Sequence, residues 1–229
     1  MGDQRFHQRL RLGAGLSPQK MVARPDYTCQ IDHRMDSMTD EQLLDRILRS
    51  ARSHGDFHDR PVPEALLRQA HDLMKWGPTT ANSQPARIFY LQSKESREKL
   101  RPALSAVNLE KTMKAPLVAL VAYDTRFYEF LPRLYHNPDA INWYNKAPVA
   151  EINGFRNGSL QGAYLILALR AVGLDCGPMS GFDLAKCDAA FFPDGRLKSN
   201  FLINIGYGTG AKLPPRNPRF SFEEQCRML

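Results

Sequence analysis

Arginine side chains that could bind an anion occur at two separate places in the chain, and at the first of them a serine hydroxyl is adjacent. Arg52 and Ser53 are adjacent, with His54 after them, and Arg216 and Arg219 lie near the carboxyl terminus. A guanidinium group binds phosphate through paired, charge-assisted hydrogen bonds, and a hydroxyl can donate one more. Both places therefore carry side chains that suit a phosphate group.

Three further stretches carry groups that suit a flat ring with carbonyl oxygens. Side-chain amides can hydrogen-bond to ring carbonyls, and a loop rich in glycine and proline lets backbone N–H groups approach a ring closely. Together with the arginine stretches, they suit flavin mononucleotide (FMN). The three stretches are Pro78 to Pro85, with Thr79, Thr80 and Asn82; Asn108 to Lys111; and Gly177 to Gly181, with Pro178, Met179 and Ser180.

Each stretch alone has an ordinary structural explanation. Glycine and proline usually mark a turn, and asparagine three residues before lysine on a helix usually lies on a solvated face. All five stretches nevertheless occur in one order along the chain, and that order resembles the nitroreductase family of FMN enzymes.

The expected helices place several of these residues. Thr39 followed by Gln42 predicts a helix start, and Pro63 predicts a second helix that ends before Gly77-Pro78. That abrupt end places Thr79 to Asn82 in a loop. Further helices are expected around 96–100, through 108–111 and from Asp183.

Apolar runs at 87–91, 117–123 and 201–205 predict the strands of a sheet. The second run is almost entirely apolar, which implies burial on both faces. Gly206 to Gly210 mimics a dinucleotide-binding fingerprint, but Pro214-Pro215 prevents the helix that such a site needs, so we reject that interpretation.

Two longer segments have more than one interpretation. Residues 125–148 are rich in aromatic side chains, and both an aromatic lid over a site and a separate packing cluster remain open. A long helix is expected over 155–172, and its small residues would permit close packing on another helix. The face expected to pack consists of Leu160, Ala163, Tyr164, Leu167, Ala168 and Ala171.

We expect one α+β domain over residues 38–229, with helices packed on a small sheet, because no repeat or linker divides it. Residues 1–37 are polar and basic, interrupted by glycine and proline, and predict a flexible N-terminal extension. A transit peptide, or a natural start at Met35 or Met38, remains an alternative.

Composition restricts the classes of function. The formal net charge is +7, but the basic residues are dispersed, without the basic run typical of nucleic-acid binding. The charge favours anionic small molecules instead, such as a phosphate-bearing cofactor or a carboxylate substrate. No apolar run is long enough for a membrane span and no secretory signal is recognisable, so we expect a cytoplasmic protein.

The four cysteines show no metal-binding pattern. Cys29, Cys176, Cys187 and Cys226 include no Cys-x-x-Cys pair and no histidine at ligand spacing, so we expect reduced thiols and no metal. Cys176 lies beside the glycine stretch. A buried packing residue is the favoured interpretation there, and a catalytic thiol is the alternative.

Within the nitroreductase family, the chain is most similar to the subgroup typified by malonic semialdehyde reductase of bacterial pyrimidine catabolism. The resemblance implies a nitroreductase-like fold, in which helices flank a central, mostly antiparallel sheet. It also implies an obligate homodimer with FMN at the interface. The similarity spans Leu43 to Leu229 and is carried by runs at 73–79, 155–157, 177–183 and 221–224.

The resemblance implies a role for each site residue. Arg52, Ser53 and His54 would lie along the phosphate, ribityl chain and ring edge, with Arg216 or Arg219 on the phosphate. Asn108 and Lys111 would face the pyrimidine side of the ring, where a cation stabilises reduced flavin. Pro178, Met179, Ser180 and Gly181 would lie near N5, and Thr79, Thr80 and Asn82 would come from the partner subunit.

Two positions depart from the family pattern. Relatives often have Arg-Arg-Ser-x-Arg where this chain has Ala51 to Gly55, so phosphate binding must depend more on Arg52 and the C-terminal arginines. Ser180 stands where many relatives carry an acidic residue, which favours an anionic substrate.

The implied activity is ping-pong reduction of malonic semialdehyde to 3-hydroxypropanoate by NADPH or NADH. FMN would carry the hydride, so we expect no catalytic nucleophile in the chain. The product proton would come from solvent, His54 or a tyrosine of residues 125–148. Two alternatives are a broad nitroaromatic or quinone reductase of the same family and a non-catalytic flavin-binding protein.

Overall fold

The computed structural model describes residues 38–211 and 213–229, which belong to one compact unit, Met38–Leu229. The expected N-terminal extension, residues 1–37, lies outside the described residues, as does Cys29.

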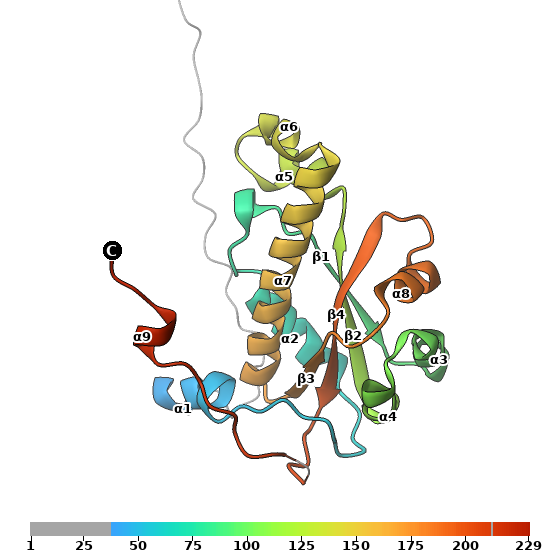
Figure 1. Ribbon diagram of the computed structural model, residues 1–229, viewed down its shortest axis with the longest axis vertical. Helices are drawn as coiled ribbons and strands as arrows, with labels where there is room; N and C mark the ends of the chain where they lie inside the picture. The colour runs from blue at the N-terminus through green and yellow to red at the C-terminus, as the bar shows by residue number, and fades with distance from the viewer. Residues whose placement is uncertain (1–37, 212) are drawn as a thin grey trace, which may run out of the picture. The chain divides into compact units, whose positions relative to one another are not determined.

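A four-stranded antiparallel sheet forms the centre of this unit (Figure 1). The apolar runs predicted three of its strands, β1, β2 and β4, and the antiparallel arrangement is the one that the family resemblance implied. Its order is β1-β2-β4-β3, so β2 and β4 are the central strands and β1 is an edge. Every residue of β2 is buried, which confirms the prediction of burial on both faces. The strands are β1 (Ala86–Leu91), β2 (Leu117–Asp124), β3 (Asp175–Met179) and β4 (Leu197–Gly206).

The prediction of one continuous glycine loop at 177–181 is partly wrong. Gly177 pairs with Asn204 and Met179 with Leu202, so the first three residues of the stretch belong to β3. Only Ser180 and Gly181 form the turn that leads to the next helix. The partner residues on β4 are far along the chain, and the local sequence of glycine and proline does not indicate them.

Helices cover both faces of the sheet. Figure 1 shows α2 and α7 on one face and α3, α4 and α8 on the other. The predicted start at Thr39 is confirmed, because Thr39 and Gln42 form a capping box. No helix in the described ranges is both long and apolar enough to cross a membrane. The helices are α1 (Asp40–Leu44), which continues as a π-helix (Asp45–Arg49), α2 (Glu64–Met74), α3 (Lys94–Leu100), α4 (Ala106–Lys114), α5 (Leu131–Leu134), α6 (Ile141–Tyr144), α7 (Ala147–Ala171), α8 (Leu184–Phe191) and α9 (Phe222–Gln225).

The long helix α7 packs through a different face from the predicted one. Leu160 and Ala163 are exposed, whereas the buried face carries glycines and amides. A Cβ on Gly154 would lie 2.8 Å from the Tyr123 ring, and one on Gly162 would lie 2.3 Å from the Phe201 ring. The glycines therefore let the helix approach large side chains of the sheet. The buried residues are Ala150, Gly154, Asn157, Gly158, Gln161, Gly162, Leu165, Ala168 and Leu169.

The aromatic segment 125–148 contains a separate packing cluster. Phe127 is fully buried, and its ring centroid lies 5.6 Å from that of Tyr144. These two rings therefore pack with each other, whereas the neighbouring Trp143 is half exposed. The buried members of the cluster are Phe127, Leu131, Ala140, Tyr144 and Ala150.

Candidate functional site

A cavity of about 270 Å³ brings together residues from both ends of the described chain. It contains the predicted phosphate residues Arg52, Ser53, Arg216 and Arg219. No carboxylate lines it, so its four guanidinium groups have no acidic neighbour in the cavity wall. We call it the arginine cavity, and its lining is Leu48, Ala51, Arg52, Ser53, Arg170, Pro214, Pro215, Arg216, Asn217 and Arg219.

Two hydrogen bonds join the N-terminal and C-terminal segments that line the arginine cavity. Arg52 donates to the carbonyl oxygen of Pro214, and Arg216 Nη2 donates to the carbonyl oxygen of Ala51 at 2.9 Å. These bonds run in opposite directions between the two chain segments. Arg219, by contrast, donates to the carbonyl oxygens of its neighbours Asn217 and Pro218, at 2.9 and 3.1 Å.

Arg170, in the last turn of α7, was not predicted as a site residue. Its Nη1 donates to the carbonyl oxygen of Ile47 at 3.0 Å, whereas its Nε is buried without a hydrogen-bond partner. A basic residue in the last turn of a helix is common because it stabilises the helix dipole. The sequence therefore contained no signal that would separate Arg170 from other helix ends.

His54 lies against β3 rather than in the arginine cavity. Its backbone N–H donates to the carbonyl oxygen of Cys176 at 2.9 Å, and Ser53 bridges to the same residue. The imidazole Nε2 lies 3.4 Å from Asp175 Oδ1, and Asp175 Oδ2 accepts a hydrogen bond from the Gly208 N–H at 2.8 Å. The side chain of His54 is only 10% exposed. Through the contacts of His54 and Asp175, the segment of His54, strand β3 and the segment of Gly208 are held together.

Helix α4 brings the predicted ring-binding residues close to these segments. A Cβ on Gly55 would lie 3.7 Å from Lys111 Cδ, so Lys111 stands beside the Arg52 segment. Asn108 is buried, and its Nδ2 donates to the carbonyl oxygen of Gly181 at 2.9 Å. Asn108 therefore anchors the Ser180-Gly181 turn, a role that the sequence did not indicate. The hydroxyl of Ser105, beside Gly181, is buried without a partner.

The predicted partner-subunit residues Thr79, Thr80 and Asn82 lie elsewhere. The Thr80 N–H donates to Asn157 Oδ1 at 2.8 Å, and Asn82 Nδ2 donates to the carbonyl oxygen of Leu134 at 2.8 Å. Along α7, Asn157 and Arg170 are separated by roughly 20 Å at the usual rise per residue. Within one chain, this turn therefore does not join the arginine cavity.

The cysteine beside the glycine stretch is a packing residue. Cys176 is fully buried in the core between the sheet, α2 and α7. Burial raises the pKa of its thiol to about 12, so the group is a neutral thiol near neutral pH. This environment does not activate a nucleophile.

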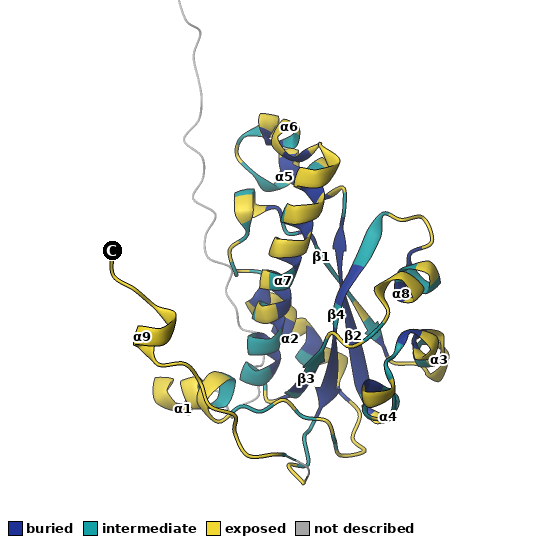
Figure 2. Cartoon of the chain, in the orientation of Figure 1, coloured by how far each residue is buried: buried dark blue, intermediate teal, exposed yellow. Residues whose placement is uncertain are grey.

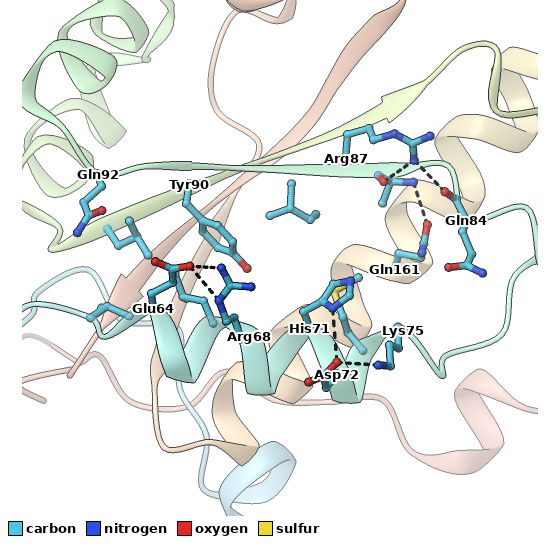
Figure 3. A pocket seen from close by; sticks show the side chains of 16 residues that line it. Glu64, Arg68, His71, Asp72, Lys75, Gln84, Arg87, Tyr90, Gln92 and Gln161 are labelled. Carbon is cyan, nitrogen blue, oxygen red and sulfur yellow. Dashed lines mark hydrogen bonds and ion pairs between the residues drawn. The ribbon is translucent and has the colours of Figure 1, made fainter. Parts of the chain in front are cut away.

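A larger cavity, of about 730 Å³, lies between α2 and the edge strand β1 (Figure 3). None of the predicted site residues lines it. Its charged side chains are already paired, with Arg68 on Glu64 and Lys75 on Asp72 at the contacts drawn in Figure 3. It shares no lining residue with the arginine cavity.

Comparison with known sequences gives a family match and similar relatives. The model described as "Nitroreductase family" matches residues 48–207. A Polynucleobacter asymbioticus protein, provisionally named NADH dehydrogenase/NAD(P)H nitroreductase, is 51% identical over 85% of this chain and 100% of its own length. A Cupriavidus pinatubonensis protein with the same provisional name is 51% identical over 83% of this chain and 100% of its own.

Solved structures share the fold. A Bacillus subtilis protein provisionally described as a nitroreductase has a TM-score of 0.73 at 22% identity, over 80% of this chain and 97% of its own. A protein from Exiguobacterium sibiricum, provisionally described as a nitroreductase in complex with FMN, has a TM-score of 0.74 at 19% identity. The match covers 84% of this chain and 98% of that protein. A Staphylococcus epidermidis protein provisionally described as an NAD(P)H:FMN oxidoreductase has a TM-score of 0.72 at 19% identity, and the match covers 81% of this chain and 95% of that protein.

Proposed function

The chain belongs to the nitroreductase family, and from that premise we propose that it is an FMN-dependent oxidoreductase that uses NADH or NADPH. One observation carries the proposal: the arginine cavity and the Lys111–Asn108–Gly181 group are connected by the short segment Arg52 to Gly55. Three residue steps of extended chain span about 10 Å. This arrangement offers a phosphate site and a ring site to one elongated cofactor.

The residues present suit both ends of FMN. At the phosphate end, the arginine cavity supplies four guanidinium groups and the Ser53 hydroxyl, and the Nε of Arg170 is a buried donor without an acceptor. At the ring end, Lys111 supplies a positive charge, and the buried Ser105 hydroxyl lacks a partner. When bound, FMN would supply hydride transfer from NAD(P)H to an acceptor, and Lys111 would stabilise the negative charge that the reduced ring gains.

The site would be completed in a homodimer. The turn with Thr79, Thr80 and Asn82 is bonded to Asn157 near the middle of α7, too far from the arginine cavity of its own chain, so it would serve the site of a second copy. On α7, Ile152 and Phe155 are 55% and 51% exposed, and such apolar side chains suit an interface. The C-terminal arm, residues 214–229, is exposed throughout and yellow in Figure 2. The arm includes Phe220, Phe222, Met228 and Leu229.

For the acceptor, we propose a short 3-oxo acid, malonic semialdehyde, reduced to 3-hydroxypropanoate. The exposed turn at Ser180 is uncharged, so it would not repel a substrate carboxylate beside the ring. Lys111 and the basic balance of the chain favour the same anionic substrate. The second candidate is reduction of nitroaromatic compounds or quinones, and its nitroreductase part is favoured by the names of the two relatives.

One anaerobic experiment tests cofactor, reductant and acceptor in turn. The absorbance spectrum of the purified full-length protein should show bound FMN, which NADPH or NADH should bleach. Malonic semialdehyde should then restore the oxidised spectrum. FMN that neither nicotinamide reduces would identify a non-catalytic flavin-binding protein, and recovery only with a quinone or nitroaromatic compound would favour the second candidate.

A further inference from the structure

We propose that Arg170 is the main phosphate-binding residue of the arginine cavity, an inference that rests on the proposed binding of FMN. Arg170 lies on α7, outside the stretches that the sequence indicated, and it lines the cavity with Arg52, Arg216 and Arg219. Its role is to bind and position the phosphate, not to take part in hydride transfer.

The charge distribution around the cavity favours an anion. Four guanidinium groups line it without a carboxylate, and like charges so close together repel one another unless an anion lies between them. A neighbouring cavity, which Arg52 also lines, differs because Asp45 and Asp175 accompany Arg46 and Arg52 there. The positive charge is thus concentrated on one side of the Arg52 segment.

The hydrogen bonds distinguish Arg170 from the other three arginines. Arg52 and Arg216 each donate to a backbone carbonyl of the other's chain segment, and Arg219 donates within its own loop. Arg170 is the only arginine of the described chain whose side chain includes a buried donor without a partner. A buried donor without a partner is costly, and a phosphate oxygen would remove that cost with a charge-assisted bond.

Arg170 is also held in place before any ligand binds. It projects from the 25-residue helix α7, and its Nη1 is fixed by the carbonyl oxygen of Ile47 at 3.0 Å. Arg219, on the exposed C-terminal arm, has no comparable support. A donor that is already ordered loses less conformational entropy on binding.

A comparison of FMN with riboflavin isolates the phosphate contact, because riboflavin has the same ring and ribityl chain without the phosphate. The full-length protein is stripped of flavin, and the dissociation constant of each flavin is measured by fluorescence quenching. Arg170→Gln should weaken FMN binding by roughly tenfold to a hundredfold. Riboflavin binding should change little. Arg170→Lys, which keeps the charge but loses the Nε donor, should give a smaller loss.

Arg46→Gln is the matched control. Arg46 Nη1 donates to the carbonyl oxygen of Ala171 at 3.4 Å, so Arg46, like Arg170, connects the end of α7 with the π-helix Asp45–Arg49. Arg46 lines the neighbouring cavity with Asp45 and Asp175, not the arginine cavity. If Arg170 only holds α7 to residues 45–49, both variants should weaken FMN and riboflavin alike. Equal losses for the two flavins in Arg170→Gln, or no loss of FMN affinity, would overturn the proposal. If the native protein binds neither flavin, the proposed function fails as well.

Discussion

His54 and Gly177 approach each other so closely that a Cβ on Gly177 would lie 2.1 Å from the carbonyl oxygen of His54. Next to this contact, the His54 N–H donates a hydrogen bond to the carbonyl oxygen of Cys176, and Ser53 forms a β-bridge with the same residue. The Arg52–His54 segment therefore lies directly along β3. Glycine at 177 thus determines how near the phosphate-binding segment can come to the strand that leads to Ser180.

Gly177→Ala should therefore damage both the fold and the flavin site. The new methyl group meets a backbone oxygen, which cannot move aside as a flexible side chain can, and overpacking of this kind costs about 1–3 kcal/mol. Urea denaturation should show the loss, and the purified variant should retain less FMN. Gly55→Ala is the control, because its Cβ would meet only Lys111 Cδ at an ordinary 3.7 Å. Equal stability of the two variants would contradict this packing.

The sequence predicted elements whose signals are local. Thr39 and Gln42 are three residues apart and form the predicted capping box, and the apolar run 117–123 became a fully buried strand. Local signals failed where a distant partner decides the structure. Gly177 was placed in a loop although Asn204 pairs with it.

The candidate site shows the same limit. Arg52 and Arg216 were singled out by residue type, and the structure brings them to one cavity. Arg170 was missed because its neighbours in the cavity come from residues 48–53 and 214–219, which only the fold brings together. The buried face of α7 was missed because a count of apolar residues passes over glycines. Those glycines make room for Tyr123 and Phe201.

Asp124 should be much more important for stability than an exposed acidic residue. Its side chain is 3% exposed and lies 3.1 Å from Arg87 and 3.2 Å from Arg196. Asp124→Ala removes the acidic partner of Arg87 and leaves Arg196 with Glu129 alone, so it should lower the free energy of unfolding by about 3–5 kcal/mol. Glu64→Ala, which removes an exposed partner of Arg68, should cost about 1 kcal/mol or less. Urea denaturation of both variants checks the difference, and similar losses would refute it.

Stability should fall at alkaline pH, and the buried cysteines should resist alkylation. Burial raises the pKa of Cys176 and Cys187 from 9.0 to about 12. Because the unfolded thiols lose their protons first, the contribution of these groups to stability is lost as pH rises from about 9 towards 12. Iodoacetamide labelling followed by mass spectrometry at pH 8 should modify exposed Cys226 and spare both buried thiols until urea is added. Rapid labelling of native Cys176 would be inconsistent with this environment.

Removal of residues 220–229 should weaken the proposed dimer. The deletion keeps all four arginines of the cavity but removes Phe220, Phe222 and the exposed chain end. Sedimentation should show more monomer, and FMN content should fall in parallel if the site needs both subunits. Full-length Glu223→Gln, an exposed change on the same arm, serves as the control. A truncated monomer that still holds one FMN per chain would exclude a shared site.

The charge at position 180 should decide between an anionic and a neutral acceptor. Ser180 is exposed in the turn that Asn108 anchors through Gly181, so a longer side chain there can point to solvent without disturbing the core. Ser180→Glu should raise KM for malonic semialdehyde more than for a neutral quinone, because only the former carries a carboxylate that the new charge repels. Ser180→Gln has the same length without the charge, so it should change both KM values alike.

The assay is steady-state kinetics with NADPH or NADH at several acceptor concentrations. Parallel double-reciprocal lines are expected, because both reactants would occupy the same ring face in turn. If Ser180→Glu and Ser180→Gln affect both acceptors equally, the carboxylate does not approach position 180. If the semialdehyde gives no turnover above a control with free FMN while quinones are reduced, the proposed substrate is wrong. The proposal of an FMN-dependent NAD(P)H reductase would then stand, because it depends on the arginine cavity and Lys111 and not on Ser180.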